Sequence, residues 1–219
     1  MIKHHPTFEL IQAFVNGELP ASLSAGIAMH AEMCPKCQHQ IAQLTDQIAE
    51  VSFENDYQDN LAVAELNIDQ MIAAITDSDD IFLPTETVEK FVVFNNETYV
   101  LPKALHSMTV GKAANIGKLS RSRIQLNENE IHTSLLQISP GGSVPAHTHK
   151  GFELTLLLEG SFHDDRGEYV KGDFIMLDGS HQHHPISTEG CLCYTVANDA
   201  LHFTQGINKL LNPIGAFIY

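Results

Sequence analysis

The spacing of the apolar residues changes near residue 80, and this change constrains the fold more than any other feature of the chain. Before it, apolar side chains recur every three or four residues, which is the period of one helix face. After it come short runs such as KFVVF, TSLLQI, LTLLLEG and CLCYTVA, separated by clusters of Gly, Asn and Asp. Short strands at close spacing are typical of a small sandwich or barrel. The sequence therefore predicts an α+β chain of two domains, an N-terminal small helical bundle and a C-terminal antiparallel β-barrel.

The stretch TDSDDIFLPTE, residues 76–86, has no apolar periodicity and carries charge and a proline. Such segments are typical of the connections between regular elements. We therefore expect a helical domain over residues 1–80, a linker over residues 81–86 and the β-domain over residues 87–219.

One helix face in the first domain continues through two cysteines. Its members are Leu23, Ile27, His30, Cys34, Cys37, Ile41, Leu44, Ile48 and Val51. Pro35 falls inside this series, and a proline breaks a helix interior but is tolerated in a first turn. Two helices should therefore meet at Cys34–Pro35. The apolar spacing predicts a further helix from about Tyr57 to Thr76.

The net charge of the chain limits the kinds of partner that it can bind. The net charge is −15, which argues against direct binding to nucleic acid, because that needs a basic surface. Residues 1–77 alone hold two basic and eleven acidic side chains, which fits either a partner with a basic face or plain solubility. The sequence contains no run of about 18 apolar residues, so we expect no membrane span. The N-terminus does not read as a signal peptide, so we expect a cytoplasmic protein whose four cysteines are thiols or metal ligands.

His30, Cys34 and Cys37 form an H-x3-C-x2-C pattern on the helix face described above. The histidine lies one helical turn before the first cysteine, and the second cysteine turns back toward the same point, so three zinc-type donors converge. A structural zinc site needs a fourth ligand. His4 or His5 can supply it from the first helix, which the apolar stripe of Leu10, Ile11, Phe14 and Val15 predicts. A redox dithiol and inert core cysteines are the alternatives to metal binding.

A second pattern, G-x5-H-x-H-x3-E-x6-G, occupies GGSVPAHTHKGFELTLLLEG. Residues two apart on a strand point to the same face, so His147 and His149 should line one pocket, joined by Glu153 from the next strand. A third histidine must come from the later stretch SHQHHP, which offers His183 or, as the alternative, His181. Imidazole and carboxylate donors suit zinc, iron, manganese, nickel or copper.

Cys191 and Cys193 share one face of the predicted strand CLCYTVA. Two cysteines at this spacing are poorly placed for a mutual disulfide. We expect them to be core residues, and an oxidisable role is the alternative.

The segment HHPTFELIQAFVNGELP, followed by MHAEMCPKC, resembles the zinc-binding anti-sigma domain, and the second pattern resembles the first motif of the cupins. In this order, the two resemble the ChrR-type zinc anti-sigma factors over almost the whole chain. The resemblance implies zinc in both domains and gives His4 as the alternative to His5. The ligands that it implies are His5, His30, Cys34 and Cys37 in the first domain and His147, His149, Glu153 and His183 in the second.

The resemblance also implies a function without catalysis. The helical bundle would clamp a group IV (extracytoplasmic-function) sigma factor and block its access to core RNA polymerase, and it would do so without help from the second domain. The cupin domain would be needed to release the sigma factor in response to singlet oxygen or a related oxidant. A metal-dependent cupin dioxygenase or isomerase with a helical dimerisation arm is one alternative, and a passive regulator that binds a small molecule is another.

Overall fold

The computed structural model describes residues 1–54, 68–77, 89–148, 151–198 and 202–203. They fall into two compact units. The first joins Met1–Thr45 to Glu89–Tyr219, and the second is Asp46–Val88. Residues 1–45 therefore pack in one unit with the β-structure that follows much later in the chain.

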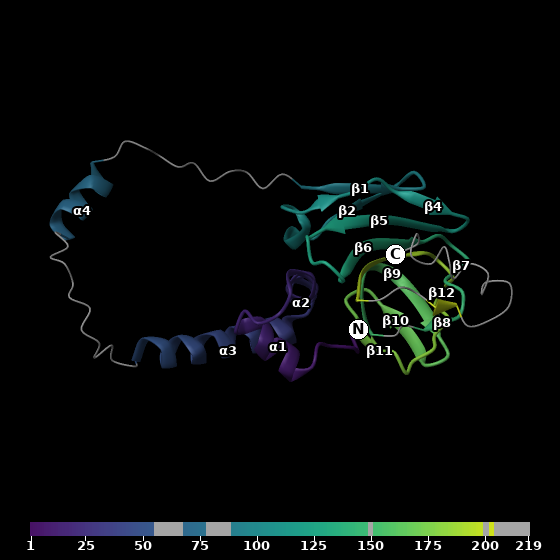
Figure 1. The fold of residues 1–219 in the computed structure, drawn as a ribbon, viewed down its shortest axis with the longest axis horizontal. Helices are drawn as coiled ribbons and strands as arrows, with labels where there is room; N and C mark the ends of the chain where they lie inside the picture. Colours follow the sequence, from purple (N-terminus) through teal and green to yellow (C-terminus); the bar gives the residue numbers. More distant parts are fainter. Residues whose placement is uncertain (55–67, 78–88, 149–150, 199–201, 204–219) are drawn as a thin grey trace. The chain divides into compact units, whose positions relative to one another are not determined.

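In the described part of the chain, four helices form where the apolar period is helical (Figure 1). They are α1 (Phe8–Val15), α2 (Ala21–Met33), α3 (Pro35–Glu54) and α4 (Ile68–Thr76). Thr7 caps α1 by accepting a hydrogen bond from the backbone N–H of Leu10 at 3.3 Å. The predicted break at Cys34–Pro35 is confirmed, and of the predicted helix at Tyr57–Thr76 the described part is α4, residues 57–67 lying outside the described residues. None of the described helices is long and apolar enough to cross a membrane.

The C-terminal part is an antiparallel sheet of short strands (Figure 1). A separate hairpin pairs β1 (Phe91–Phe94) with β2 (Glu97–Val100), and a 3-10 turn, η1, spans Lys103–Leu105. The other strands are β3 (Thr109–Val110), β4 (Ala114–Ile116), β5 (Leu119–Gln125), β6 (His132–Ile138), β7 (Gly142–Ser143), β8 (His147–Thr148), β9 (Phe152–Asp164), β10 (Gly167–Val170), β11 (Phe174–Asp178), β12 (Ile186–Ser187), β13 (Cys191–Ala197) and β14 (His202–Phe203).

Strand β9 organises this sheet. The order of the main sheet is β3-β5-β6-β13-β9-β12-β7, with β10 and β11 both paired to β9 and β4 paired to β5. A second small ladder joins β14 to β8. The predicted α+β architecture is confirmed, with a cupin-like sheet; among the described strands, the hydrogen-bonded path does not close into a barrel.

The two faces of the sheet enter different apolar clusters because side chains alternate along a strand. On one face, Leu154 and Tyr194 belong to a large buried cluster that also contains Ile27 and Met29 of α2. On the other face, Leu157 lies in a smaller cluster that includes both cysteines of β13. Helix α2 thus buries its apolar side chains against the sheet rather than within a bundle of its own.

Polar contacts fix the start of α2 on the sheet. The backbone N–H of Ser22 lies 3.2 and 3.3 Å from the two carboxylate oxygens of Glu128, and a carboxylate stabilises the positive end of a helix. The hydroxyl of Tyr194 donates to the backbone carbonyl of Ser22 at 2.8 Å. Both partners come from the β-structure, so the sheet holds the first turn of the helix.

Gly26 allows α2 to approach the sheet closely. A Cβ atom at this position would lie 2.7 Å from Cδ2 of Leu154 and 3.6 Å from Cε1 of Tyr194. Both neighbours are fully buried, so a larger side chain could enter only if the core moved apart.

We expect Gly26→Leu to lower the free energy of unfolding by about 1–3 kcal/mol, because it overpacks this contact. The measurement is urea denaturation followed by circular dichroism. Ala21→Leu, at an exposed position of the same helix, should change the free energy by less than about 0.5 kcal/mol. Equal effects of the two substitutions would contradict the close packing.

Candidate metal centres

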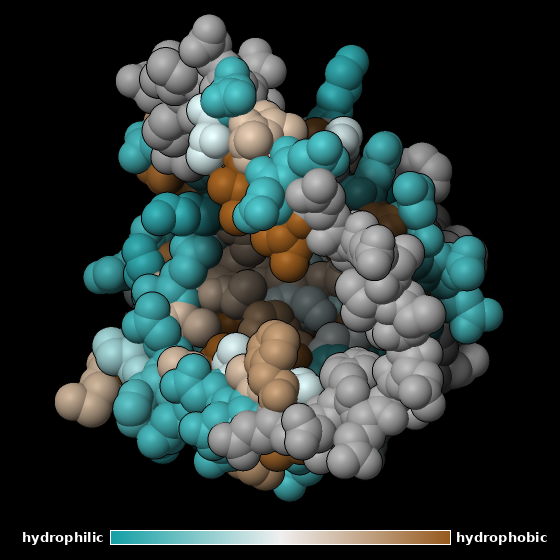
Figure 2. Space-filling view, turned by 90° about the vertical axis from the view of Figure 1, so that its left-hand side faces the viewer, coloured by the Kyte–Doolittle hydropathy of each residue, from teal (hydrophilic) through white to brown (hydrophobic). Residues whose placement is uncertain are grey.

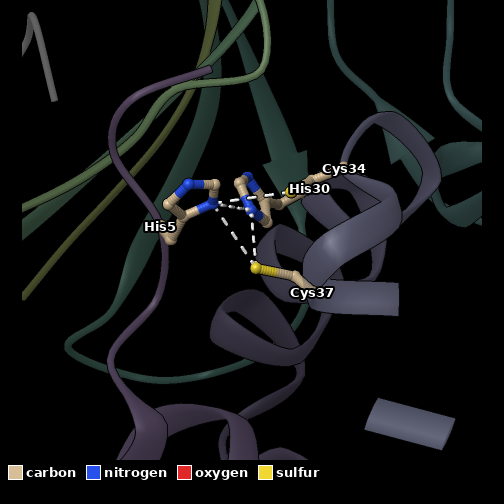
Figure 3. Close-up of side chains that lie close together, drawn as sticks. All are labelled: His5, His30, Cys34 and Cys37. Carbon is tan, nitrogen blue, oxygen red and sulfur yellow. Dashed lines mark hydrogen bonds between the residues drawn. The ribbon is translucent and has the colours of Figure 1, made fainter. Parts of the chain in front are cut away.

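Two histidines and two cysteines from three separate segments meet at one point (Figure 3). His5 comes from the segment before α1, and His30 lies in the last turn of α2. Cys34 occupies the break between helices in an extended conformation, with φ −119° and ψ 98°, and Cys37 lies in the first turn of α3. The proline after Cys34 produces this break, so that both thiols face inward.

The distances within this first cluster fit a tetrahedral metal ion better than hydrogen bonds. Nδ1 of His5 lies 3.4 Å from Nε2 of His30 and 3.5 Å from Sγ of Cys34 and of Cys37. Nε2 of His30 lies 3.3 Å from Sγ of Cys37. Bond lengths typical of zinc place two nitrogens about 3.3 Å apart, and a nitrogen and a sulfur about 3.6 Å apart, around a tetrahedral ion. One ring nitrogen cannot form hydrogen bonds to three such neighbours at once, since it carries at most one hydrogen.

The surroundings prepare the two histidines for a metal. Burial lowers the pKa of His30, and burial together with the charge of Lys36 lowers the pKa of His5. Nδ1 of His30 lies 2.7 Å from the carbonyl oxygen of Gly172, so Nδ1–H donates there and Nε2 keeps its lone pair toward the cluster. Burial raises the pKa of Cys37 to about 11, so a metal that binds must displace the thiol proton.

The structure separates the two neighbouring histidines that the sequence left as alternatives. His5 enters the cluster, whereas the ring of His4 packs on Tyr169 with the ring centroids 4.9 Å apart. Consecutive residues of an extended segment point in opposite directions. The geometry therefore favours His5 as the fourth donor.

We expect His5→Ala to abolish tight zinc binding at this cluster and His4→Ala to leave it unchanged, because only His5 supplies a donor atom. The measurement is the zinc released by a thiol-blocking mercurial and detected with a metallochromic dye, a treatment that reports zinc held by cysteines. Loss of this zinc in the His4 variant alone would reverse the assignment.

A second cluster lies in the cupin-like part and consists of His147, Glu153 and His183. Their relative exposures are 2%, 4% and 8%, so all three side chains are buried. Nε2 of His183 lies 2.7 Å from Nε2 of His147 and 3.1 Å from Oε2 of Glu153. Two imidazoles and one carboxylate form a donor set for zinc, iron or manganese that leaves coordination positions open.

The backbone brings the two histidines of this cluster together and orients the ring of His147. His147 and His183 form an antiparallel bridge, each N–H donating to the other's carbonyl at 3.1 Å. Nδ1 of His147 lies 2.8 Å from the carbonyl oxygen of Pro145. Donation to this carbonyl fixes the hydrogen on Nδ1 and turns the lone pair of Nε2 toward the other donors.

The structure brings together three of the four predicted donors of the second cluster. His149 lies outside the described residues, so its place in the pocket stays a prediction. His181, the alternative to His183, lies at the surface and pairs with the carboxylate of Asp178. The geometry therefore favours His183 over His181.

Cys191 and Cys193 lie in the apolar cluster beside this pocket. Their sulfur atoms are 4.0 Å apart and both side chains are buried. The contact with Cys193 lowers the pKa of Cys191, and the same contact together with burial raises the pKa of Cys193. Both cysteines are free thiols and pack as core residues, as predicted.

The fold and the two clusters define a protein in which a helical segment with two cysteines and two histidines packs on a cupin-like sheet. Residues 117–201 match the family model of the ChrR cupin-like domain. The anti-sigma-E factor ChrR of Cereibacter sphaeroides is 26% identical over 214 residues, which are 97% of this chain and 97% of that protein. The predicted resemblance to ChrR-type anti-sigma factors is therefore confirmed.

The fold is also similar to that of a solved structure. A chain in the crystal structure of Rhodobacter sphaeroides SigE in complex with the anti-sigma ChrR aligns with a TM-score of 0.67 and 22% identity. The alignment covers 90% of this chain and 99% of that chain. The helical segment and the cupin-like part therefore occur together in a protein of known structure.

Proposed function

We propose that this protein is an anti-sigma factor that binds and inhibits a group IV sigma factor in the cytoplasm. The observation that carries the proposal is the similarity to ChrR across 97% of both chains, together with a compact cluster of zinc-type donors in the helical segment. In this proposal, residues 1–80 bind the sigma factor, residues 81–86 connect the domains, and residues 87–219 form the sensor. Zinc occupies the first cluster, and zinc, iron, manganese or nickel occupies the second.

Apolar side chains without partners among the described residues support a protein partner for the second compact unit. Four apolar residues of helix α4 have relative exposures of 52–73%, namely Ile68, Met71, Ile72 and Ile75. Their spacing places them on one face of the helix. The end of α3 adds Val51 and Phe53, which are 65% and 87% exposed. Figure 2 shows the hydropathy of one side of the molecule, with brown hydrophobic residues beside teal hydrophilic ones. An exposed apolar helix face is a common mode of binding to a groove on a partner.

The charge of the helical segment supports a basic partner. Residues 1–77 carry eleven acidic side chains and only Lys3 and Lys36 as basic ones. Sigma factors bind DNA, which requires basic surfaces. Opposite charges would raise the rate of association more than the final affinity.

We expect Ile72→Asp to weaken binding of the sigma factor at least about tenfold, since it places a charge in the centre of the apolar face of α4. Ala73→Asp adds the same charge beside this face and is the matched control. The measurement is calorimetric titration with the sigma factor recovered from the native host by co-purification and mass spectrometry. Failure of the wild-type chain to retain any sigma factor would overturn the proposed function.

The second cluster is the sensor in this proposal. An oxidant such as singlet oxygen would alter the buried pocket, and the change would loosen the hold of the helical segment on the sigma factor. The cluster supports this role because it lies within the same compact unit as α1, α2 and the first cluster.

We expect the double substitution His147→Ala and Glu153→Ala to leave sigma inhibition intact and to abolish release by singlet oxygen, because it removes donors from the sensor only. The measurement is transcription in vitro before and after illumination with a photosensitiser. His181→Ala, a surface histidine of the same part, should behave like the wild type. Loss of inhibition together with release would contradict this division of roles.

Two buried imidazoles and a carboxylate also favour a second candidate, a metal-dependent cupin enzyme whose helical segment is an accessory arm. The donor set would then bind a substrate or dioxygen at its open positions. Turnover by the iron- or manganese-loaded protein, in the absence of any sigma-factor binding, would support this candidate instead.

A further inference from the structure

A single turn of the cupin-like part holds the N-terminal segment that carries His5. Asp173 lies between β10 and β11 and is completely buried. Its Oδ1 accepts hydrogen bonds from the backbone N–H groups of Lys3 at 2.6 Å and of His4 at 2.9 Å. Its Oδ2 accepts one from the N–H of Val170 at 2.9 Å. The carboxylate thus fastens the two residues that precede His5 to the sheet.

The backbone around Asp173 completes this attachment. The N–H of Phe174 donates to the carbonyl of His4 at 3.0 Å. The turn therefore binds the N–H groups of Lys3 and His4 and also the carbonyl of His4. Gly172 has φ +91°, and a Cβ atom there would lie 2.4 Å from Cδ1 of Ile2. The positive φ therefore favours glycine at this position, and the side chain of Ile2 packs directly over it.

The same turn also holds the other histidine of the first cluster. The carbonyl of Gly172 accepts the hydrogen bond from Nδ1 of His30 at 2.7 Å. The ring of Phe174 contacts the ring of His30 edge-on, with the centroids 5.8 Å apart. Three consecutive cupin residues, 172–174, therefore contact both segments that supply the histidine donors.

We propose that the turn at residues 172–174 positions His5 and His30 for the metal, with Asp173 as the key positioning residue. The cupin-like part then sets the metal affinity of the cluster in the helical segment. By thermodynamic reciprocity, the metal in turn strengthens the attachment of residues 1–45 to the sheet. This inference rests on the proposed metal binding at the first cluster.

The hydrogen bonds to Asp173 explain why a carboxylate occupies this buried position. Three backbone N–H groups converge on one side chain, and a carboxylate offers only acceptors. Asp173→Asn keeps the size of the side chain but replaces one acceptor oxygen with a donor NH₂ group, so at least one of the three N–H groups loses its partner. The metal donors themselves remain unchanged in this variant.

The test is a titration of the metal-free, full-length protein with cobalt(II), followed by competition with zinc. A thiolate-to-cobalt absorption band reports the first cluster alone, since the second has no thiol donor. We expect Asp173→Asn to weaken zinc binding at this cluster about 10- to 100-fold, the usual effect of losing a group that orients a ligand. The band should still reach its full intensity at saturation, because all four donors are present.

Ser187→Ala is the matched control. Ser187 is completely buried in the same sheet and bonds the carbonyl of Ser161 at 2.6 Å, and it is not a member of the first cluster. Its substitution should leave the zinc affinity unchanged.

Ile2→Ala is a second test variant. It loosens the contact over Gly172 without burying an unpaired polar group, and it should weaken zinc binding several-fold. This variant tests the inference if Asp173→Asn does not fold.

Wild-type zinc affinity in the Asp173→Asn protein, or in Ile2→Ala where the former does not fold, would overturn the inference while leaving the proposed metal site intact. An equal loss of affinity in Ser187→Ala would also overturn it, because the effect would then reflect general loss of stability. Absence of the thiolate band in the wild type would contradict metal binding at the cluster itself and would remove both proposals.

Discussion

The burial of one face of α2 against the sheet is the interaction on which the other features depend. Ile27 and Met29 enter the main core of the sheet, and Glu128 and Tyr194 hold the first turn of the helix. The helix carries His30 in its last turn, so this packing also sets where the first cluster can form. Among its described residues, the helical segment has one small apolar cluster of its own, around Ile11 and the two cysteines.

Local signals predicted the helices and, apart from β5, the described strands of four or more residues, whereas features set by distant partners could not be predicted. Pro35 and the apolar period were sufficient to place the break between α2 and α3. Strand β5, with the sequence LSRSRIQ, was not predicted, because the side chains that it buries include Ser120 and Ser122. Their hydroxyls find partners at Asn95 and Gly111, which no local pattern reveals. The packing of α2 on the sheet likewise depends on Ser22 and on a carboxylate 106 residues away.

The donors of both clusters followed largely from spacing, since helical turns and strand alternation fix which side chains converge. Spacing could not choose between His4 and His5, because the choice depends on which way an extended segment is attached, and Asp173 determines this. The role of Gly172 was also beyond sequence reasoning, since a backbone carbonyl leaves no signature in the residue type. His149 and the metal in each cluster stay predictions. The resemblance to ChrR, by contrast, is confirmed along nearly the whole chain.

Helix α3 begins at the first cluster, and its length has a mechanical consequence. Its 20 residues make a rod about 30 Å long. Cys37 lies in its first turn, and Ile41 and Leu44 pack against the small apolar cluster around Ile11. A rotation of about 10° about its start would move the end of a rigid helix of this length by about 5 Å. A small displacement where the helix begins would thus be amplified toward its end.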